Sequence, residues 1–236
     1  MLKTLYFLFF KVEKIWNTIS TFLRSVYFNF AFLPFRQALK LPIWIERPAF
    51  HFRGYRGDIV IDADDLHFKM IRLGYRYNSW YPFNGINLQI VGKLVFHGRC
   101  TIGNSASVYV GNNGVIEFGD NVYIASKTRI ICQKKIVFGK STLIGWNSQI
   151  IDTDFHALLD IVSGRPTKIL SPVIIGNKCW IASDCIVQKG TKLADNVIVS
   201  AGSVVSGIFK KENVILKGNP AMEIAEGYKL LEEYSL

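Results

Sequence analysis

The chain is poor in the residues that metal sites and disulfide frameworks need. Its 236 residues include four cysteines and four histidines, and no two cysteines have the spacing of metal ligands. Gly-rich phosphate loops of the P-loop and dinucleotide-binding types are missing as well. Only 19% of the residues are charged against 50% hydrophobic, so much apolar surface is available for burial. We therefore predict no metal site, and reduced, structural thiols of the kind typical of a cytosolic protein.

Long uncharged apolar runs are also missing. Charged residues interrupt the apolar N-terminal stretch, so neither a transmembrane span nor a secretory signal is expected there. Instead, apolar residues recur at helical spacing and predict an amphipathic helical segment within residues 1–48. These residues are Leu2, Leu5, Phe9, Val12, Trp16, Ile19, Leu23 and Val26.

Positive charge is concentrated near the N-terminus. The net charge is +10, and residues 1–50 hold seven basic against two acidic groups. A basic, aromatic-rich amphipathic helix suits the surface of an anionic membrane. The alternative is that the helix packs on the rest of the chain or at a subunit interface. No nucleic-acid-binding motif accompanies the charge, and no nucleic-acid partner is expected.

What the chain does have is a six-residue period. A branched aliphatic residue falls at each of the positions Ile175, Ile181, Val187, Leu193, Val199 and Val205. Four residues after each of the first five lies a small or β-branched side chain, namely Cys179, Cys185, Thr191, Val197 and Ser203. A period of six fits neither a helix nor an isolated strand, but it fits a triangular coil with three short faces. The pattern therefore predicts a β-solenoid, whose coils bury their faces by stacking.

The same period, with slips, indicates one repeat domain over residues 87–221, followed by a C-terminal tail at 222–236. Residues 49–86 look irregular and rich in arginine and aromatic side chains, which suits either a cap on the solenoid or a sugar site. The period stops in a loop at 151–174, within which the run 151–156 holds Asp152, Asp154 and His156. An excursion from a regular scaffold is where function usually lies.

These motifs resemble the hexapeptide-repeat acyltransferases, in particular the maltose, galactoside and capsular-polysaccharide O-acetyltransferases. The resemblance is specific at 143–156, at 175–183 and at Gly218-Asn219-Pro220-Ala221. It implies an all-β fold, a left-handed parallel β-helix, with the N-terminal helical segment added, and a homotrimer. It also implies acetyl-CoA as co-substrate and a saccharide acceptor from a surface polysaccharide or its lipid-linked precursor. The expected location is cytoplasmic, at the inner face of the membrane if the helix binds lipid.

Acetyl transfer to a hydroxyl needs a general base, a donor for the tetrahedral oxyanion and a groove for the pantetheine arm. His156 is the only histidine in the break and falls where the family has its catalytic base. Asp154 is the candidate to orient the imidazole, although a main-chain carbonyl can do this, and one or both aspartates could instead bind loop backbone. The resemblance also makes the backbone N–H of Ser183 an oxyanion donor.

The resemblance further implies which residues contact the coenzyme. Trp180 would flank the acceptor or the pantetheine end, small residues would line the groove, and lysines would meet the phosphates. The candidates are Trp180, Ala182, Ser183, Ala201, Gly202, Lys210 and Lys217. The chain departs from the pattern at Met222, where related enzymes often have arginine, and Lys210 is shifted from the usual position.

Three alternatives use the same scaffold. A γ-class carbonic anhydrase needs a three-histidine metal site, which the two histidines of the coils, His97 and His156, do not supply. A nucleotide-sugar N-acetyltransferase normally carries an N-terminal nucleotide-binding unit whose glycine signals are missing here. A catalytically inactive scaffold is the third alternative, against which the intact histidine break and the run 180–183 argue.

Overall fold

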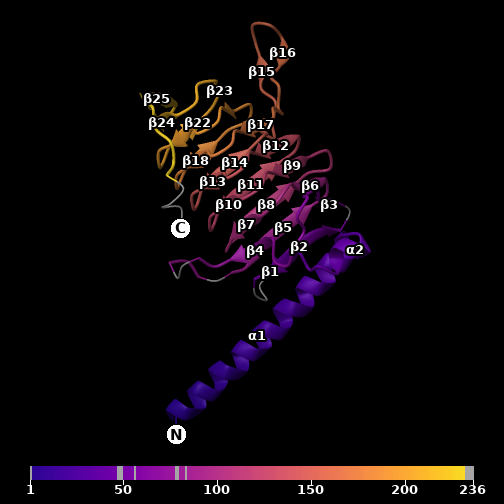
Figure 1. Ribbon diagram of the computed structural model, residues 1–236. Helices are drawn as coiled ribbons and strands as arrows, with labels where there is room; N and C mark the ends of the chain where they lie inside the picture. The colour runs from indigo at the N-terminus through magenta and orange to yellow at the C-terminus, as the bar shows by residue number, and fades with distance from the viewer. Residues whose placement is uncertain (1, 47–49, 56, 78–79, 83, 232–236) are drawn as a thin grey trace.

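The computed structural model describes residues 2–46, 50–55, 57–77, 80–82 and 84–231, without the side chains of 2–14, 50–51 and 53–55. The predicted helical positions Leu2, Leu5, Phe9 and Val12 thus lie outside the described side chains, and residues 232–236 of the predicted tail lie outside the described chain. The chain forms a stack of triangular coils with a long helix, α1 (Leu2–Phe32), at its N-terminal end (Figure 1). A short helix, α2 (Phe35–Ala38), follows.

Each coil gives one strand to each of three parallel sheets, here called A, B and C. Sheet A contains β1 (Ile43–Ile45), β4 (Ile71–Tyr75), β7 (Cys100–Gly103), β10 (Val122–Ile124), β13 (Leu143–Ile144), β18 (Trp180–Ile181), β21 (Ile198–Val199) and β24 (Val214–Gly218). An antiparallel strand, β25 (Ala221–Glu226), ends this sheet.

Sheet B contains β2 (Phe50–Tyr55), β5 (Ile86–Ile90), β8 (Ala106–Val110), β11 (Arg129–Cys132), β14 (Gln149–Ile151), β19 (Ile186–Val187) and β22 (Val204–Val205). Sheet C contains β3 (Asp58–Ile61), β6 (Lys93–Phe96), β9 (Val115–Phe118), β12 (Lys135–Phe138), β17 (Val173–Ile175), β20 (Lys192–Leu193) and β23 (Ile208–Phe209). The turns between successive sheets are called the A–B, B–C and C–A corners.

The six-residue period places one aliphatic side chain inside the prism per face. Ile175 belongs to sheet C, Ile181 to sheet A and Val187 to sheet B, and each is at most 1% exposed. Identical positions stack between coils, as the ladder of Phe96, Phe118 and Phe138 shows with successive ring centroids 5.1 Å apart. The predicted parallel β-solenoid is therefore confirmed, because neighbouring coils bury each other's inward side chains.

The small positions of the period lie inside the corners. Cys179 and Cys185 are fully buried there, and all four cysteines of the chain are buried and free. Burial raises the pKa of the Cys179 thiol to about 12. Such thiols stay protonated at neutral pH and pack as small apolar groups.

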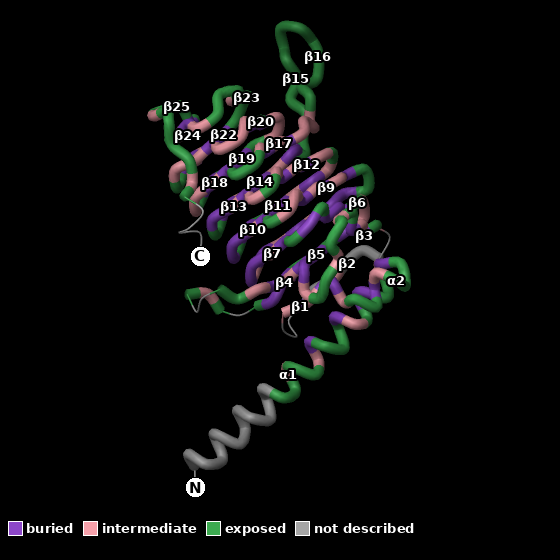
Figure 2. The backbone as a smooth tube through the Cα atoms, viewed as in Figure 1, coloured by how far each residue is buried: buried purple, intermediate pink, exposed green. Residues whose placement is uncertain are grey.

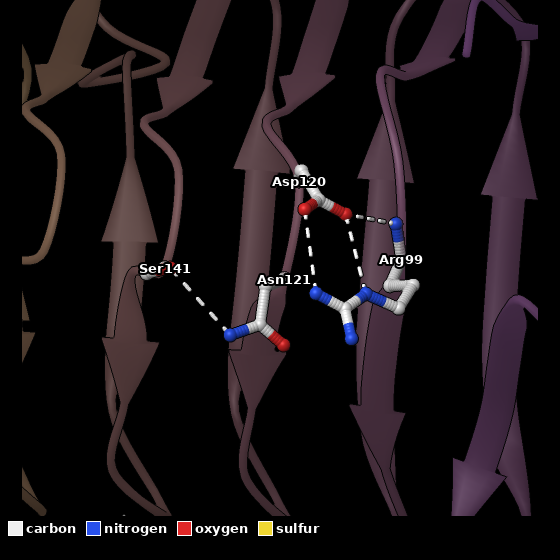
Figure 3. A network of polar contacts seen from close by, with 4 residues as sticks. All are labelled: Arg99, Asp120, Asn121 and Ser141. Carbon is white, nitrogen blue, oxygen red and sulfur yellow. Dashed lines mark hydrogen bonds and ion pairs between the residues drawn. The ribbon is translucent and has the colours of Figure 1, made fainter. Parts of the chain in front are cut away.

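Polar side chains link the coils along the C–A corner. Figure 3 shows Arg99 paired with the carboxylate of Asp120 of the next coil, and the Asn121 amide directed at Ser141 one coil further on. Asn121 and Ser141 adopt positive φ angles of 61° and 53° at this sharp corner.

Residues 49–86, expected to be irregular or to form a cap, carry regular strands. β1 pairs with β4, β2 with β5 and β3 with β6, all in parallel. The β-helix therefore begins well before residue 87, and α1 covers its first strand. No helix in the described part of the chain has the length and apolarity to cross a membrane.

Candidate active site

The break in the repeat is a protruding hairpin at the B–C corner. The chain leaves the prism after β14 and returns at β17, and between them β15 (Leu159–Asp160) pairs antiparallel with β16 (Arg165–Pro166). Figure 1 shows this hairpin standing clear of the coils. At its base, the Asp154 amide donates to the Ile169 carbonyl and Thr153 bridges to Leu170.

The two aspartates of the break have different surroundings. Asp152 is completely buried, and its carboxylate accepts the backbone N–H groups of Gln133, Lys134 and Lys135, each at 2.7 Å. These three groups belong to the B–C corner of the preceding coil. Asp152 therefore binds backbone, one of the two roles considered for it, and holds the hairpin base on the prism.

Asp154 is half exposed and its carboxylate lies 2.6 Å from the ammonium group of Lys189, on the next coil. The same ammonium group also donates to the Lys168 carbonyl. His156 is exposed, and its imidazole makes no hydrogen bond or ion pair with the residues described here. Within one chain, Lys189 and not His156 is the partner of Asp154. The role of Asp154 as orienter of His156 stays a prediction.

Ser183 lies at the A–B corner. Its carbonyl accepts the Gly202 amide of the next coil at 3.0 Å, whereas its own N–H donates to none of the described residues. Gly145 lies directly beneath it, since a Cβ there would come within 2.5 Å of the Ser183 nitrogen. A glycine thus lets the preceding coil approach this amide closely.

Four other residues that are predicted to contact the coenzyme lie at two different corners of the prism. Ala201 and Gly202 are exposed at the A–B corner one coil after Ser183, and a Cβ on Gly202 would meet no atom within 4 Å. Lys217 is exposed in β24, which lies beside β21 on the next coil. Because Leu216 pairs with Val199, Lys217 comes one residue after this pair and extends the row of Ser183 and Ala201 by one coil. Lys210 follows β23 and therefore lies at the C–A corner, away from this row.

Trp180 and Ala182 flank the corner. Trp180 is half buried on the outer face of sheet A, one residue before the inward Ile181. The amide of Ala182 donates to Val199, and its carbonyl accepts the Ser148 hydroxyl at 3.1 Å. Ala182 therefore fixes the backbone on which Ser183 sits.

The two halves of the predicted site lie at different corners of the prism. His156 belongs to the B–C corner and Ser183 to the A–B corner, with the width of sheet B between them. Five residues of extended chain span roughly 15 Å. A single chain therefore presents the predicted base and the predicted oxyanion donor on separate edges. No group of three or more potential ligands in the described residues is placed to hold a metal ion.

Comparison with known proteins identifies the repeat. A family model described as bacterial transferase hexapeptide (six repeats) matches residues 172–207. WcaF of Escherichia coli (strain K12), named for an acetyltransferase role in colanic acid biosynthesis, is 31% identical over 113 residues. These are 47% of this chain and 58% of WcaF, so the chain spans little more than half the length of that relative. The galactoside O-acetyltransferase of the same strain is 27% identical over 65% of this chain and 75% of its own length.

A solved structure supports the architecture. The polySia-specific acetyltransferase NeuO superimposes with a TM-score of 0.56 at 18% identity, over 80% of this chain and 91% of its own. At this identity the likeness shows the fold alone, and the predicted left-handed parallel β-helix with an N-terminal helix is confirmed. The six-residue period, its corner residues and the match at 172–207 show a hexapeptide repeat, and the chain resembles the hexapeptide-repeat acyltransferases.

Proposed function

We propose that the protein transfers an acetyl group from acetyl-CoA to a hydroxyl of a saccharide, in a surface polysaccharide or its lipid-linked precursor. The observation that carries the proposal is the Ser183 amide, which donates to no described residue and is followed one coil later by the exposed Ala201 and Gly202. The small residues Ala201 and Gly202 leave room for a thin pantetheine arm, and Lys217 lies further along for its phosphates. The names of the similar proteins support the saccharide acceptor.

The proposed mechanism uses two protein groups. The His156 imidazole removes the proton of the acceptor hydroxyl as its oxygen attacks the thioester carbon. The carbonyl oxygen becomes an oxyanion, which the Ser183 N–H stabilises more strongly than it stabilises the ground state. Collapse of this intermediate breaks the carbon–sulfur bond, and the imidazolium returns its proton to the leaving thiolate.

This mechanism requires more than one chain, and we propose a homotrimer. His156 and Ser183 lie on separate edges of one prism, so neighbouring subunits would combine one group of each. The hairpin supports this arrangement, because its tip exposes apolar side chains that a subunit contact would bury. Leu158, Leu159, Ile161 and Val162 are 69%, 64%, 89% and 93% exposed.

The trimer has a direct test. Light scattering on the purified protein should give three times the chain mass, and replacing Ile161 and Val162 by serine should shift the population toward monomer. The physical reason is the apolar area that these two side chains expose in an isolated subunit. A wild-type monomer that transfers acetyl groups at assay concentration would contradict the proposal.

We also propose that α1 binds an anionic membrane surface. The face of α1 on the prism joins polar side chains to the buried Phe28: Ser25 accepts the Ile45 amide at 3.0 Å, and the Asn29 side chain bonds both backbone groups of Ile43. With about 100° between successive residues, the apolar stripe falls on nearly the opposite side. Its members Trp16, Ile19 and Leu23, together with the neighbouring Ile15 and Tyr27, are 48–69% exposed (Figure 2).

The chain's own prism therefore does not cover this stripe, and lipid is the occupant that its basic surroundings favour. Arg24, Arg36 and Lys40 are exposed, and each basic group near an anionic surface contributes about 1 kcal/mol. Because acetyl-CoA is a cytoplasmic metabolite, the inner face of the cytoplasmic membrane is the expected location.

Flotation with vesicles tests this proposal. The full-length protein should float with phosphatidylglycerol vesicles, less so at high salt, and the double variant Ile19→Glu, Leu23→Glu should stay in the soluble fraction. A variant with the same two charges off the stripe, Asn17→Glu with Ala31→Glu, is the matched control. If the stripe variant floats like wild type, or loses its trimer instead of its vesicle binding, the stripe is not a lipid surface.

The catalytic proposal is tested with the glycan itself. Surface glycan of the source organism, de-O-acetylated by mild base, should gain the mass of acetyl groups when incubated with the protein and acetyl-CoA. Release of free CoA thiol should rise when the glycan is added. Release that is the same with and without glycan would contradict acetyl transfer to a saccharide.

A further inference from the structure

Trp146, which the six-residue period does not single out, lies in line with Ser183. β13 pairs with β18 at Ile144 and Ile181, and β18 pairs with β21 at Ile181 and Val199. Counting two residues on from each pair places Trp146, Ser183 and Ala201 in one column along the A–B corner. Two hydrogen bonds of 3.0 Å confirm the column, from the Asp184 amide to the Trp146 carbonyl and from the Gly202 amide to the Ser183 carbonyl. Neighbouring coils are about 4.8 Å apart.

The column is asymmetric about Ser183. On the N-terminal side lies the largest side chain of the corner, Trp146, and on the C-terminal side lie Ala201 and Gly202 without bulk. A long thin chain fits over the small residues, whereas a wide ring surface lies on the other side of the same amide. The two sides of Ser183 are thus built for different ligands.

A second tryptophan completes the ring surface. Trp80 contacts Trp146 edge to face, with ring centroids 5.5 Å apart and an interplanar angle of 82°. The segment 80–82 that carries it lies along the A–B corner: the Asn104 amide donates to the Pro82 carbonyl at 2.9 Å, and the Lys127 ammonium lies 4.2 Å from the Tyr81 ring centroid. Residues of three successive coils therefore hold this segment against the corner.

Both indoles remain open to solvent. Trp80 is 68% exposed and Trp146 is 39% exposed, although the core of the prism is closed and aliphatic. Exposed tryptophans held in a fixed mutual geometry present apolar faces and indole N–H donors together. Ligand sites combine such aromatic walls with a few polar groups, and the C–H faces of a pyranose pack on aromatic rings of this kind.

We propose that Trp80 and Trp146 form the binding surface for a pyranose ring of the acceptor, on the N-terminal side of Ser183. The coenzyme arm then lies on the C-terminal side, over Ala201 and Gly202, and the two substrates meet at the Ser183 amide. This assignment rests on the proposed acetyl transfer to a saccharide and adds the place where the saccharide binds.

The variants Trp80→Ala and Trp146→Ala test the surface in the full-length protein. Each should raise KM for the de-O-acetylated glycan about tenfold, the loss expected for a central aromatic contact, and should raise it more than KM for acetyl-CoA. Trp80→Phe should recover part of the affinity because a ring face is retained. The matched control is Tyr228→Ala after β25, since Tyr228 is also an exposed aromatic residue, at 54%, bonds Asn213 at the C–A corner and should change neither constant. Glycan KM values within about twofold of wild type in both alanine variants would overturn the proposal.

A binding measurement separates this proposal from the proposed reaction. Glycan titrated into the protein without acetyl-CoA should change the tryptophan fluorescence, and Trp80→Ala and Trp146→Ala should each reduce that change. If the wild type binds glycan in this way but transfers no acetyl group, the surface stands and the reaction is wrong. If it transfers acetyl groups while both variants bind glycan as wild type does, the reaction stands and the surface is wrong.

Discussion

Replacing His156 by alanine is expected to lower the rate of acetyl transfer by about 10²–10⁴-fold, the contribution of a general base. The physical reason is that a saccharide hydroxyl is a weak nucleophile at neutral pH and must lose its proton as it attacks. His156 is exposed on the hairpin and makes no hydrogen bond or ion pair with the described residues, so the fold should not change. The measurement is kcat/KM for the glycan, with circular dichroism and light scattering to verify fold and assembly.

The matched control for this variant is His67→Ala. His67 is likewise an exposed histidine, in the first coils and away from the hairpin, and its loss should leave the rate unchanged. Activity of His156→Ala within about threefold of wild type would remove His156 from the mechanism. A further variant, Asp154→Asn, separates two roles: an altered pH profile of kcat/KM indicates orientation of His156, whereas an unchanged profile indicates that Asp154 serves only Lys189.

Replacing Asp152 by alanine should lower the free energy of unfolding more than any other substitution proposed above. The buried carboxylate accepts three backbone N–H groups at 2.7 Å, and its removal leaves these donors of the preceding coil without their acceptor. Unsatisfied buried donors cost about 1–3 kcal/mol each, and partial access of water lowers the sum. We expect a loss of about 3 kcal/mol, which for a chain of this size lowers Tm by about 6–12 °C.

Differential scanning calorimetry of Asp152→Ala beside Asp154→Ala makes the comparison. The two aspartates are two residues apart and carry the same charge, but Asp154 forms a half-exposed ion pair with Lys189. Such pairs contribute about 0–1 kcal/mol, so Asp154→Ala should melt close to wild type. Equal melting temperatures for the two variants would show that Asp152 does not hold the hairpin base.

The sequence pattern predicts the N-terminal helix, but it does not predict which side of the helix packs on the prism. The stripe of Trp16, Ile19 and Leu23 predicts a helix, and α1 includes it. The stripe alone left open whether it packs on the prism. The first strand decided this, because β1 has no earlier strand to bond and its unpaired backbone groups need polar partners. Ser25 and Asn29 supply them, which turns the apolar stripe outward.

The strands of the first coils do not follow from the six-residue period. Residues 49–86 contain strands in register with the later coils, although the six-residue period is not visible there. β2 has a register shift between Arg53 and Tyr55, and β4 has one between Leu73 and Tyr75. Extra residues at these points shift the spacing of the inward side chains, so a fixed period in the sequence cannot follow them.

The sequence by itself determined the repeat, the inward positions between residues 90 and 205, and the position of the break with His156. It could do so because a coil of constant length repeats the direction of its side chains at a constant interval. Only the tertiary structure decided how residues far apart in the chain meet. It assigned the Asp152 carboxylate to the preceding coil, the Asp154 carboxylate to Lys189, and Trp146 to a column with Ser183 and Trp80. These contacts depend on the register between coils and on the length of each corner, neither of which a single six-residue unit contains.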